Sequence, residues 1–267
     1  MTIKPAFDGW ITLGSLGNKL KFEIPFKKHK HFNKMIKRGS LKQCVRLSKN
    51  NIVLMFDIKD PEQKKENKTI IGIDVGQKTI LTCSDNQIIS MDSHGHSYQT
   101  ICQRLSRKQK GSKGFKRTEA HRANFIGWSI NQLNLKEIGA VNLENIKNLR
   151  KGKRSSRSLS HWNYSELFEK LERKLVENGV RINKLSPVYT SQRCFNCGWV
   201  RKGNRRGKQF KCDKCSFEYD ADLNASKNIS LNLKAISRKE RLQQKNKDGF
   251  YWPVVGEEPI VPRARKM

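Results

Sequence analysis

Four cysteines most constrain what this chain can fold into. They form two Cys-x-x-Cys pairs, Cys194 with Cys197 and Cys212 with Cys215, with fourteen residues between the pairs. Each pair can turn two thiolates toward one ion, and two such pairs close a tetrahedral zinc site. Four thiolates leave no open position for a substrate, so the spacing predicts a structural zinc ion and places any catalysis elsewhere.

Two disulfides are the alternative explanation of the same spacing. Disulfide frameworks are typical of small secreted domains, but this sequence shows no secretory signal, and its other cysteines, Cys44, Cys83 and Cys102, are isolated. The zinc site is therefore favoured.

The charge balance limits the partners of the chain. Its 267 residues include 55 Lys and Arg against 24 Asp and Glu, a net charge of +31. Such an excess indicates a polyanion partner, most commonly nucleic acid; a ribosomal or other structural RNA-binding protein is the simplest alternative. The longest apolar run near the start, Ile52–Phe56, is too short to span a bilayer. We expect a cytoplasmic protein without a membrane partner.

Residues 1–60 are expected to form a small β-rich region, a partial barrel or meander. Short β-branched and aromatic runs alternate there with Gly, Pro and Asn-Asn turns. His29 and His31 lie in a lysine-rich segment, where solvated or phosphate-facing histidines are more usual than a metal pair. Residues 61–68 are charged and predict a linker. The expected strands are Trp10–Leu13, Lys19–Ile24, Cys44–Leu47 and Ile52–Ile58.

Residues 69–189 are expected to form the first part of an α/β core. The apolar spacing over 98–136 predicts one or two helices broken at Gly111–Gly114, and a further helix is expected over Tyr164–Asn178 with Gly179 as its C-cap. Residues 190–219 are assigned to the zinc ribbon, 220–236 to the last core helix and 237–267 to a basic, flexible tail. The expected core strands are 69–76, 79–83, 87–91, 138–145 and 180–185.

Three acids fall at the ends of these elements. Asp74 and Glu144 each close an apolar strand, and Asp222 opens the last helix. A carboxylate at a buried strand end is costly unless it is paired or bound to a cation. Any one of them alone is explained as a cap or a surface acid; all three together, in a chain poor in acids, favour a catalytic site.

The order of elements, with its acids, predicts an RNase H-like α/β fold with an inserted zinc ribbon. Carboxylates from neighbouring strands and a facing helix can hold two Mg²⁺ ions, because this ion prefers oxygen ligands. Two such ions about 4 Å apart can activate a water and stabilise both the attacking and the leaving oxygen of a phosphodiester. Asp74, Glu144 and Asp222 are the expected Mg²⁺ or Mn²⁺ ligands. Asp220 is the near neighbour that is easily mistaken for the third ligand.

Four segments also resemble a known family. They are 72–76 (GIDVG), 141–146 (VNLENI), Thr190–Gly198 (TSQRCFNCG) and 222–225 (DLNA). In sequence and order they are similar to the split RuvC motifs and zinc ribbon of the TnpB (OrfB) proteins of insertion sequences, relatives of type V CRISPR effectors. The resemblance runs from about Ile71 to Leu233, and more loosely over the first sixty residues.

The resemblance implies a transposon-associated, RNA-guided DNA endonuclease with a RuvC fold. It implies that Asp74, Glu144 and Asp222 bind the catalytic metals and that the zinc ribbon helps to handle the target strand. The family usually carries a helical recognition segment within its N-terminal barrel, and no such segment is recognised here, so a shortened N-terminus is expected. DNA and a guide RNA are the expected partners of a monomer.

Two other functions remain open at this point. One is a truncated or domesticated derivative that binds nucleic acid without cutting it. The other is a guide-independent, structure-selective nuclease of the junction-resolvase kind, which the zinc ribbon disfavours.

The ribbon itself suggests a nucleic-acid surface. Basic side chains crowd the segment between the two cysteine pairs and are expected to contact phosphate rather than bases. Phe195, Trp199 and Phe217 are expected to cover the zinc site, with base stacking as the alternative. The basic residues are Arg201, Lys202, Arg205, Arg206, Lys208 and Lys211.

Overall fold

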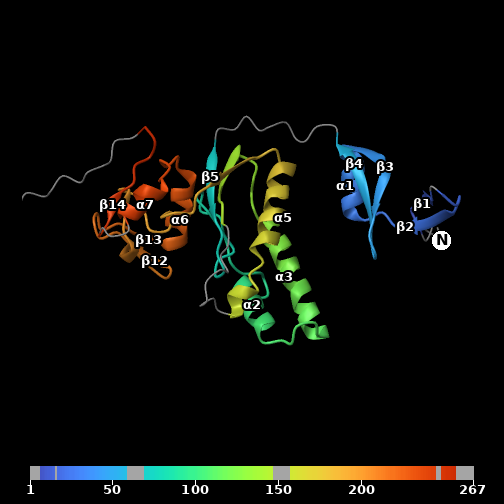
Figure 1. Ribbon diagram of the computed structural model, residues 1–267, viewed down its shortest axis with the longest axis horizontal. Helices are drawn as coiled ribbons and strands as arrows, with labels where there is room; N and C mark the ends of the chain where they lie inside the picture. Colours follow the sequence, from blue (N-terminus) through green and yellow to red (C-terminus); the bar gives the residue numbers. More distant parts are fainter. Residues whose placement is uncertain (1–6, 16, 59–68, 147–156, 245–247, 257–267) are drawn as a thin grey trace, which may run out of the picture. The chain divides into compact units, whose positions relative to one another are not determined.

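The computed structural model describes residues 7–15, 17–58, 69–146, 157–244 and 248–256 (Figure 1). The chain divides into two compact units between Gln63 and Lys64, inside the predicted linker 61–68, whose own residues lie outside the described ranges. Each unit has its own fold. Among the described residues, even the 19-residue helix α3 (Lys113–Asn131) lacks the apolar stretch that a membrane span requires.

The first unit contains two β-hairpins with a helix between them. Its strands fall where the sequence predicts them, but the hairpins remain two separate two-stranded sheets. The described strands therefore do not close the partial barrel that we expected. Among the described residues of this unit only Phe32 is buried, so little core is available to join the sheets. The elements are β1 (Gly9–Gly14), β2 (Lys21–Phe26), α1 (Lys30–Arg38), β3 (Gly39–Leu47) and β4 (Ile52–Ile58).

Helix α1 occupies the lysine-rich segment, where the sequence analysis predicted no helix. The Nδ1 atom of His29 accepts a hydrogen bond from the Phe32 backbone N–H at 3.1 Å and caps the helix. Phe32 packs against Phe26 and Phe56, with ring centroids 5.6 and 5.4 Å apart. His29 thus has a structural role as an N-cap.

The second unit is built on a five-stranded sheet with the order β7-β6-β5-β8-β9. Strands β5, β8 and β9 are parallel, whereas β6 runs antiparallel to β5 and β7 antiparallel to β6, as a meander. In the register between β5 and β8, Ile73 lies opposite Leu143. All five strands match predicted ones. They are β5 (Ile70–Asp74), β6 (Leu81–Cys83), β7 (Ile88–Ile89), β8 (Ala140–Glu144) and β9 (Arg181–Leu185).

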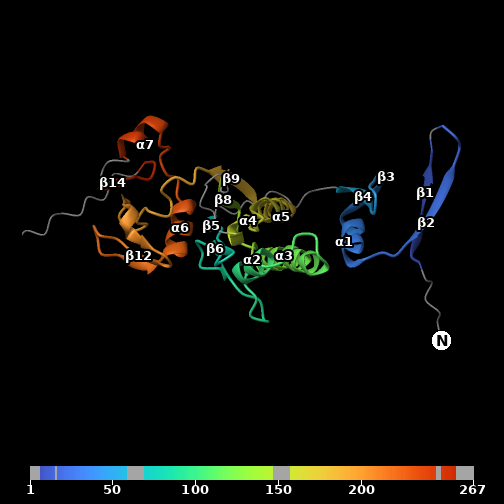
Figure 2. The ribbon, with the colours of Figure 1, turned by 60° about the horizontal axis from the view of Figure 1, so that its bottom comes forward.

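Helices cover the two faces of this sheet unequally (Figures 1 and 2). One face of the sheet belongs to the main hydrophobic core, where it packs with apolar side chains of α3 and α5. Its strand residues include Ile71, Ile73, Val141 and Leu143. The intervening residues of β5 and β8 face α6. Besides α3, the helices are α2 (Tyr98–Ser106), α4 (Arg157–Ser160), α5 (Tyr164–Glu177) and α6 (Ala221–Ser230).

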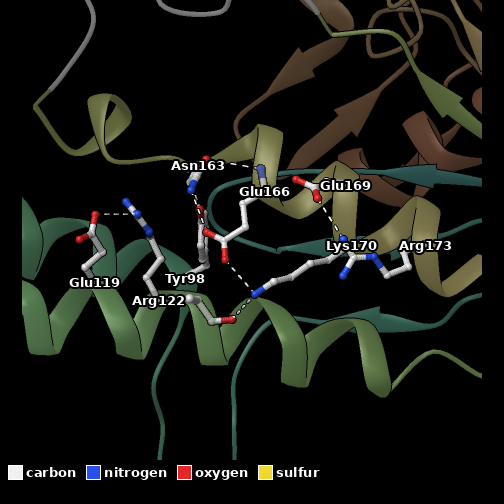
Figure 3. A network of polar contacts seen from close by, with 9 residues as sticks. Tyr98, Glu119, Arg122, Asn163, Glu166, Glu169, Lys170 and Arg173 are labelled. Atoms are coloured by element: carbon white, nitrogen blue, oxygen red, sulfur yellow. Dashed lines mark hydrogen bonds and ion pairs between the residues drawn. The ribbon is translucent and has the colours of Figure 1, made fainter. Parts of the chain in front are cut away.

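Polar contacts fasten α5 onto α2 and α3 (Figure 3). The Tyr98 hydroxyl accepts a hydrogen bond from the Asn163 backbone N–H at 2.9 Å, and Asn163 caps α5. Lys170 forms an ion pair with Glu166 at 2.8 Å and donates to the carbonyl of Ala123 at 3.0 Å. At its other end α5 stops at Glu177 with Asn178 as the C-cap, and the predicted Gly179 follows one residue later with a φ of +70°.

Gly72 lets α6 approach the centre of the sheet. A Cβ atom at this position would overlap backbone atoms of Ser226, Ile229 and Ser230 in α6. On the neighbouring strand, the Asn142 side chain donates to the carbonyl of Ile229 at 2.8 Å. Gly72 on β5 therefore leaves room for α6, and the hydrogen bond from Asn142 on β8 holds α6 on this face.

Replacing Gly72 by alanine should push α6 away from the sheet. Because the added methyl meets backbone rather than a flexible side chain, we expect a loss of about 3 kcal/mol in the free energy of unfolding. Gly127→Ala, in helix α3 with open space around its Cα, is the matched control and should stabilise by about 1 kcal/mol. Urea unfolding of both variants tests this; equal stabilities would show that the close approach is unimportant.

A cysteine-rich module precedes α6, and the chain after α6 packs against that module. Strand β14 pairs with β10, and the Trp252 side chain is buried. The buried Arg193 donates through Nε to the Trp252 carbonyl at 2.8 Å. The described residues of the predicted tail 237–267 thus include a helix and a strand; residues 245–247 and 257–267 lie outside the described ranges. The elements are β10 (Trp199–Val200), η1 (Lys202–Asn204), β11 (Arg205–Arg206), β12 (Gln209–Lys211), β13 (Glu218–Asp220), α7 (Arg238–Gln244) and β14 (Phe250–Tyr251).

Candidate metal centres

Two of the three predicted acids end neighbouring parallel strands. Ile73 of β5 lies opposite Leu143 of β8, so Asp74 and Glu144 occupy equivalent positions at the carboxyl edge of the sheet. Side chains alternate along a strand, so Asp74 points to the same face as Gly72, the face that α6 covers. The topology thus brings two carboxylates to the same end of α6.

The third acid, Asp222, lies in the first turn of α6. Asp220 is the N-cap, and one of its carboxylate oxygens accepts hydrogen bonds from the backbone N–H groups of Asp222 and Leu223 at 2.9 and 3.0 Å. Asp222 is only 7% exposed. The structure therefore gives the two neighbouring acids different roles: Asp220 starts the helix, and the carboxylate of Asp222 is turned inward.

The three carboxylates lie within electrostatic reach of one another. Burial, together with the negative charges of Glu144 and Asp222, raises the pKa of Asp74 to about 7, against the opposing charge of Arg205. Burial also raises the pKa of Glu144, an effect opposed by the hydrogen bond that the Thr190 hydroxyl donates to it. The oxygens of these three acids do not all lie within 4.8 Å of one another, unlike the ligand atoms of the cysteine cluster described below.

Two basic residues reach into this group of acids. Arg205 forms an ion pair with Asp222, with Nη2 2.7 Å from Oδ1, and Lys208 contacts the other carboxylate oxygen and the Thr79 hydroxyl. The sequence analysis had predicted phosphate contacts for both. In this structure they neutralise Asp222.

The acids suit a hard divalent cation. Their donors are all carboxylate oxygens, which Mg²⁺ and Mn²⁺ prefer. Burial first, and then the charges of Glu144 and Asp222, raise the pKa of Asp74, and a nearby cation would stabilise its ionised form against both effects. Arg205 and Lys208 neutralise part of the negative charge of the three acids, and a bound ion would have to share the Asp222 carboxylate with them.

The four predicted zinc ligands form a second centre. The sulfur atoms of Cys194, Cys197, Cys212 and Cys215 all lie within 4.8 Å of one another. Cys194 and Cys215 are 3.7 Å apart, and Cys197 and Cys212 are 3.6 Å apart. A zinc ion with four bonds of about 2.3 Å separates its sulfurs by about 3.8 Å, whereas a disulfide bond is far shorter. The cluster could bind zinc, and all four thiols are free of disulfides.

Tight turns present these sulfurs to a common point. Gly198 and Ser216 follow the first and second Cys-x-x-Cys pairs with positive φ angles of 79° and 59°. Trp199 and Phe217 pack against the cysteine cluster, as expected. Phe195 differs: Lys227 lies 5.3 Å from its ring centroid, and the ring does not belong to this cluster.

The remaining predicted basic residues line a groove beside the module. It has a volume of about 720 Å³, and its walls come from the module and from the chain around Phe250. Arg201 also forms ion pairs with Asp213 and Asp248. The structure therefore divides the predicted basic set, since Arg205 and Lys208 face Asp222. The groove-lining members of the set are Arg201, Lys202, Arg206 and Lys211.

Parts of this chain match a family model and known proteins. Residues 164–229, which run from α5 through the cysteine module into α6, match the family model described as Cas12f1-like, TNB domain. The chain is 24% identical over 193 residues to the putative RNA-guided DNA endonuclease InsQ of Escherichia coli K12, covering 60% of this chain and 48% of InsQ. The resemblance to the TnpB proteins is confirmed.

The same relationship extends to Cas12f1 nucleases. The chain is 33% identical over 138 residues to a CRISPR-associated endodeoxyribonuclease Cas12f1 of Sulfoacidibacillus thermotolerans, covering 51% of this chain and 32% of the relative. A Cas12f1 of an uncultured archaeon is 29% identical over 224 residues, covering 70% of this chain and 42% of that protein. A Cas12f1–sgRNA–target DNA complex aligns over 67% of this chain and 52% of the other, with 28% identity and a TM-score of 0.46. The chain spans less than half the length of the curated relatives described here.

Three supporting residues were not assigned a role from sequence. Gly72 leaves room for α6, and Asn142 hydrogen-bonds the carboxyl end of that helix. Thr190 donates a hydrogen bond to Glu144. A polar residue within an apolar strand was the available signal for Asn142, whereas the contact of Thr190 with Glu144 depends on the folded path of the chain.

Proposed function

We propose that this chain is an RNA-guided, divalent-metal-dependent DNA endonuclease of the TnpB type. The observation that carries the proposal is the convergence of Asp74, Glu144 and Asp222 from two neighbouring strand ends and the first turn of a facing helix. The printed names of the Cas12f1 and InsQ relatives, which denote endonucleases, support it.

The topology supports an RNase H-like, RuvC-type core. An antiparallel meander of β5, β6 and β7 is extended by the parallel strands β8 and β9, with helices on both faces. The cysteine module enters just before α6, at the place where we predicted a zinc ribbon. Cys194, Cys197, Cys212 and Cys215 would hold Zn²⁺ as a structural ion.

Asp74, Glu144 and Asp222 would hold Mg²⁺ or Mn²⁺. Such ions supply an activated water and stabilise charge on the phosphodiester oxygens. The Thr190 hydroxyl restrains Glu144 by donating to it, and Asp220 keeps Asp222 in register by capping α6. Arg205 and Lys208 reduce the repulsion among the acids.

The groove provides a surface for a nucleic-acid strand. Lys202 and Arg206 are exposed on it, and the chain as a whole carries a charge of +31. We propose that the groove contacts phosphates of DNA or of the guide RNA. We also propose that the protein is a monomer.

Salt dependence tests this assignment. Lys202→Ala and Arg206→Ala should each weaken DNA binding and reduce the slope of log K against log salt concentration by about one unit. Lys49→Ala removes an exposed charge from the first unit and should leave the slope unchanged. Fluorescence anisotropy at several salt concentrations measures the slope; identical slopes in all three variants would contradict a phosphate-binding groove.

Co-purified nucleic acid tests the guided activity. The chain should be expressed with the DNA that flanks its gene, and the RNA that purifies with it should be sequenced. We expect one discrete RNA and Mg²⁺-dependent cleavage only of a target that matches it. Heterogeneous RNA, or equal cleavage of unmatched branched DNA, would contradict guidance and favour a structure-selective nuclease.

A second candidate function is nucleic-acid binding without cleavage. The ion pairs that Arg205 and Lys208 make with Asp222 favour it, because these two cations occupy a carboxylate that the metals would need. Target binding without cleavage, at any Mg²⁺ or Mn²⁺ concentration, would identify this function.

A further inference from the structure

We propose that Asp92, His96 and His121 form a separate binding site for a transition-metal ion such as Zn²⁺ or Ni²⁺. One ligand atom from each lies within 4.8 Å of the other two. The three residues belong neither to the cysteine cluster nor to the acids at the sheet edge. Their site lies between the loop that precedes α2 and the side of α3.

The loop holds two of the donors in a fixed geometry. Met91 and Ser97 form a bridge across its base, and Gly95 turns the chain with a φ of +75°. One carboxylate oxygen of Asp92, Oδ1, accepts the backbone N–H groups of His94 and His96 at 2.9 and 2.8 Å. The other oxygen, Oδ2, therefore points toward the His96 ring, 3.1 Å from its Nδ1 atom.

Helix α3 supplies the third donor from a rigid position. His121 is followed by Arg122, whose Nη1 donates to the His161 carbonyl at 2.8 Å, and then by Ala123, whose carbonyl accepts from Lys170 (Figure 3). These contacts tie this turn of α3 to α5 and the segment before it. The rings of His96 and His121 lie 4.8 Å apart at 83°, so the edge of one imidazole faces the other ring.

This donor set selects a class of metal. Two imidazole nitrogens and one carboxylate oxygen suit Zn²⁺, Ni²⁺ or Co²⁺, whereas Mg²⁺ prefers oxygen ligands alone. The side chains of Asp92 and His96 are 15% and 29% exposed, so an ion can reach them. Water, or the exposed His94 ring 6.2 Å from His96, would complete the coordination. A bound ion would clamp the loop onto α3 and so steady the start of α2.

Ni²⁺ titration of the whole protein tests the site. The cysteine cluster is first loaded with Zn²⁺, and millimolar Mg²⁺ occupies the carboxylates at the sheet edge. Calorimetry should then find one further Ni²⁺ site, and His96→Ala or His121→Ala should weaken it by at least about tenfold. His31→Ala, which removes an exposed histidine from the first unit, should bind as the wild type does.

A sulfur ligand placed in the site reports coordination directly. Unlike His121→Ala, His121→Cys should still bind Co²⁺ in the zinc-loaded protein, and it should add a thiolate charge-transfer band that the wild type lacks at this site. Circular dichroism confirms that each variant is folded. No further Ni²⁺ site in the wild type, undiminished affinity in folded His121→Ala, or no new band in folded His121→Cys would each overturn the proposal and leave an ordinary His–Asp hydrogen bond.

Discussion

Asp222→Asn is expected to lower the rate of DNA cleavage by about 1000-fold or more, equivalent to about 4 kcal/mol of transition-state stabilisation. Asparagine is nearly isosteric but carries no charge, so it cannot balance a divalent cation or pair with Arg205 and Lys208. The fold should persist, because Asp222 is not the residue that caps α6.

The matched control lies two residues earlier. Asp220→Asn makes the same chemical change, and asparagine caps helices about as well as aspartate does. We expect this variant to keep near wild-type cleavage and stability. Single-turnover cleavage of a matched target, with both proteins at equal concentration and in excess Mg²⁺, measures the difference. Equal activity of the two variants, or loss only in Asp220→Asn, would show that the wrong acid has been assigned.

Cys197→Ser is expected to remove the structural ion and unfold the cysteine module. Binding of structural zinc contributes about 10–16 kcal/mol in zinc-finger peptides, and the apolar cluster around the cysteines of this module is small. Because β13 leads directly into α6, loss of the module should also loosen Asp222 and reduce cleavage.

Metal content and hydrogen exchange measure this effect together. The wild type should contain one Zn²⁺ that resists mild chelation, and Cys197→Ser should contain none in the module and lose amide protection over residues 194–219. Cys44→Ser, at an exposed cysteine of the first unit, is the control and should retain the bound Zn²⁺ and the amide protection of residues 194–219. Full protection of the module in metal-free Cys197→Ser would contradict a structural role for the ion.

The main features of the second unit could be predicted because they depend on local patterns. Apolar strands ending in Asp74 and Glu144, and a helix stopped by Gly179, each carry their signal within a few residues. The four cysteines likewise specify their cluster by spacing alone. For this reason the positions of the five strands along the chain and the clustering of the four sulfurs agree with the sequence analysis.

The features that were missed depend on contacts between distant segments. The basic segment between the cysteine pairs looks uniform in sequence, yet β11 and β12 fold as a hairpin that turns Arg205 toward Asp222 and leaves Arg206 at the groove. The burial of Trp252 depends on the pairing of β14 with β10, across about fifty residues. The helix α1 was missed because its capping residue is a histidine rather than Ser, Thr, Asp or Asn.

Counting bound Mn²⁺ by electron paramagnetic resonance tests most directly whether Asp74, Glu144 and Asp222 form one divalent-cation centre. The zinc-loaded wild type should bind two Mn²⁺ ions with the magnetic coupling of a close pair. Asp74→Asn and Asp222→Asn should each lose that coupling, whereas Asp220→Asn and His121→Ala should keep it. Uncoupled Mn²⁺ in the wild type, or a coupled pair that survives both Asp74→Asn and Asp222→Asn, would contradict the assignment.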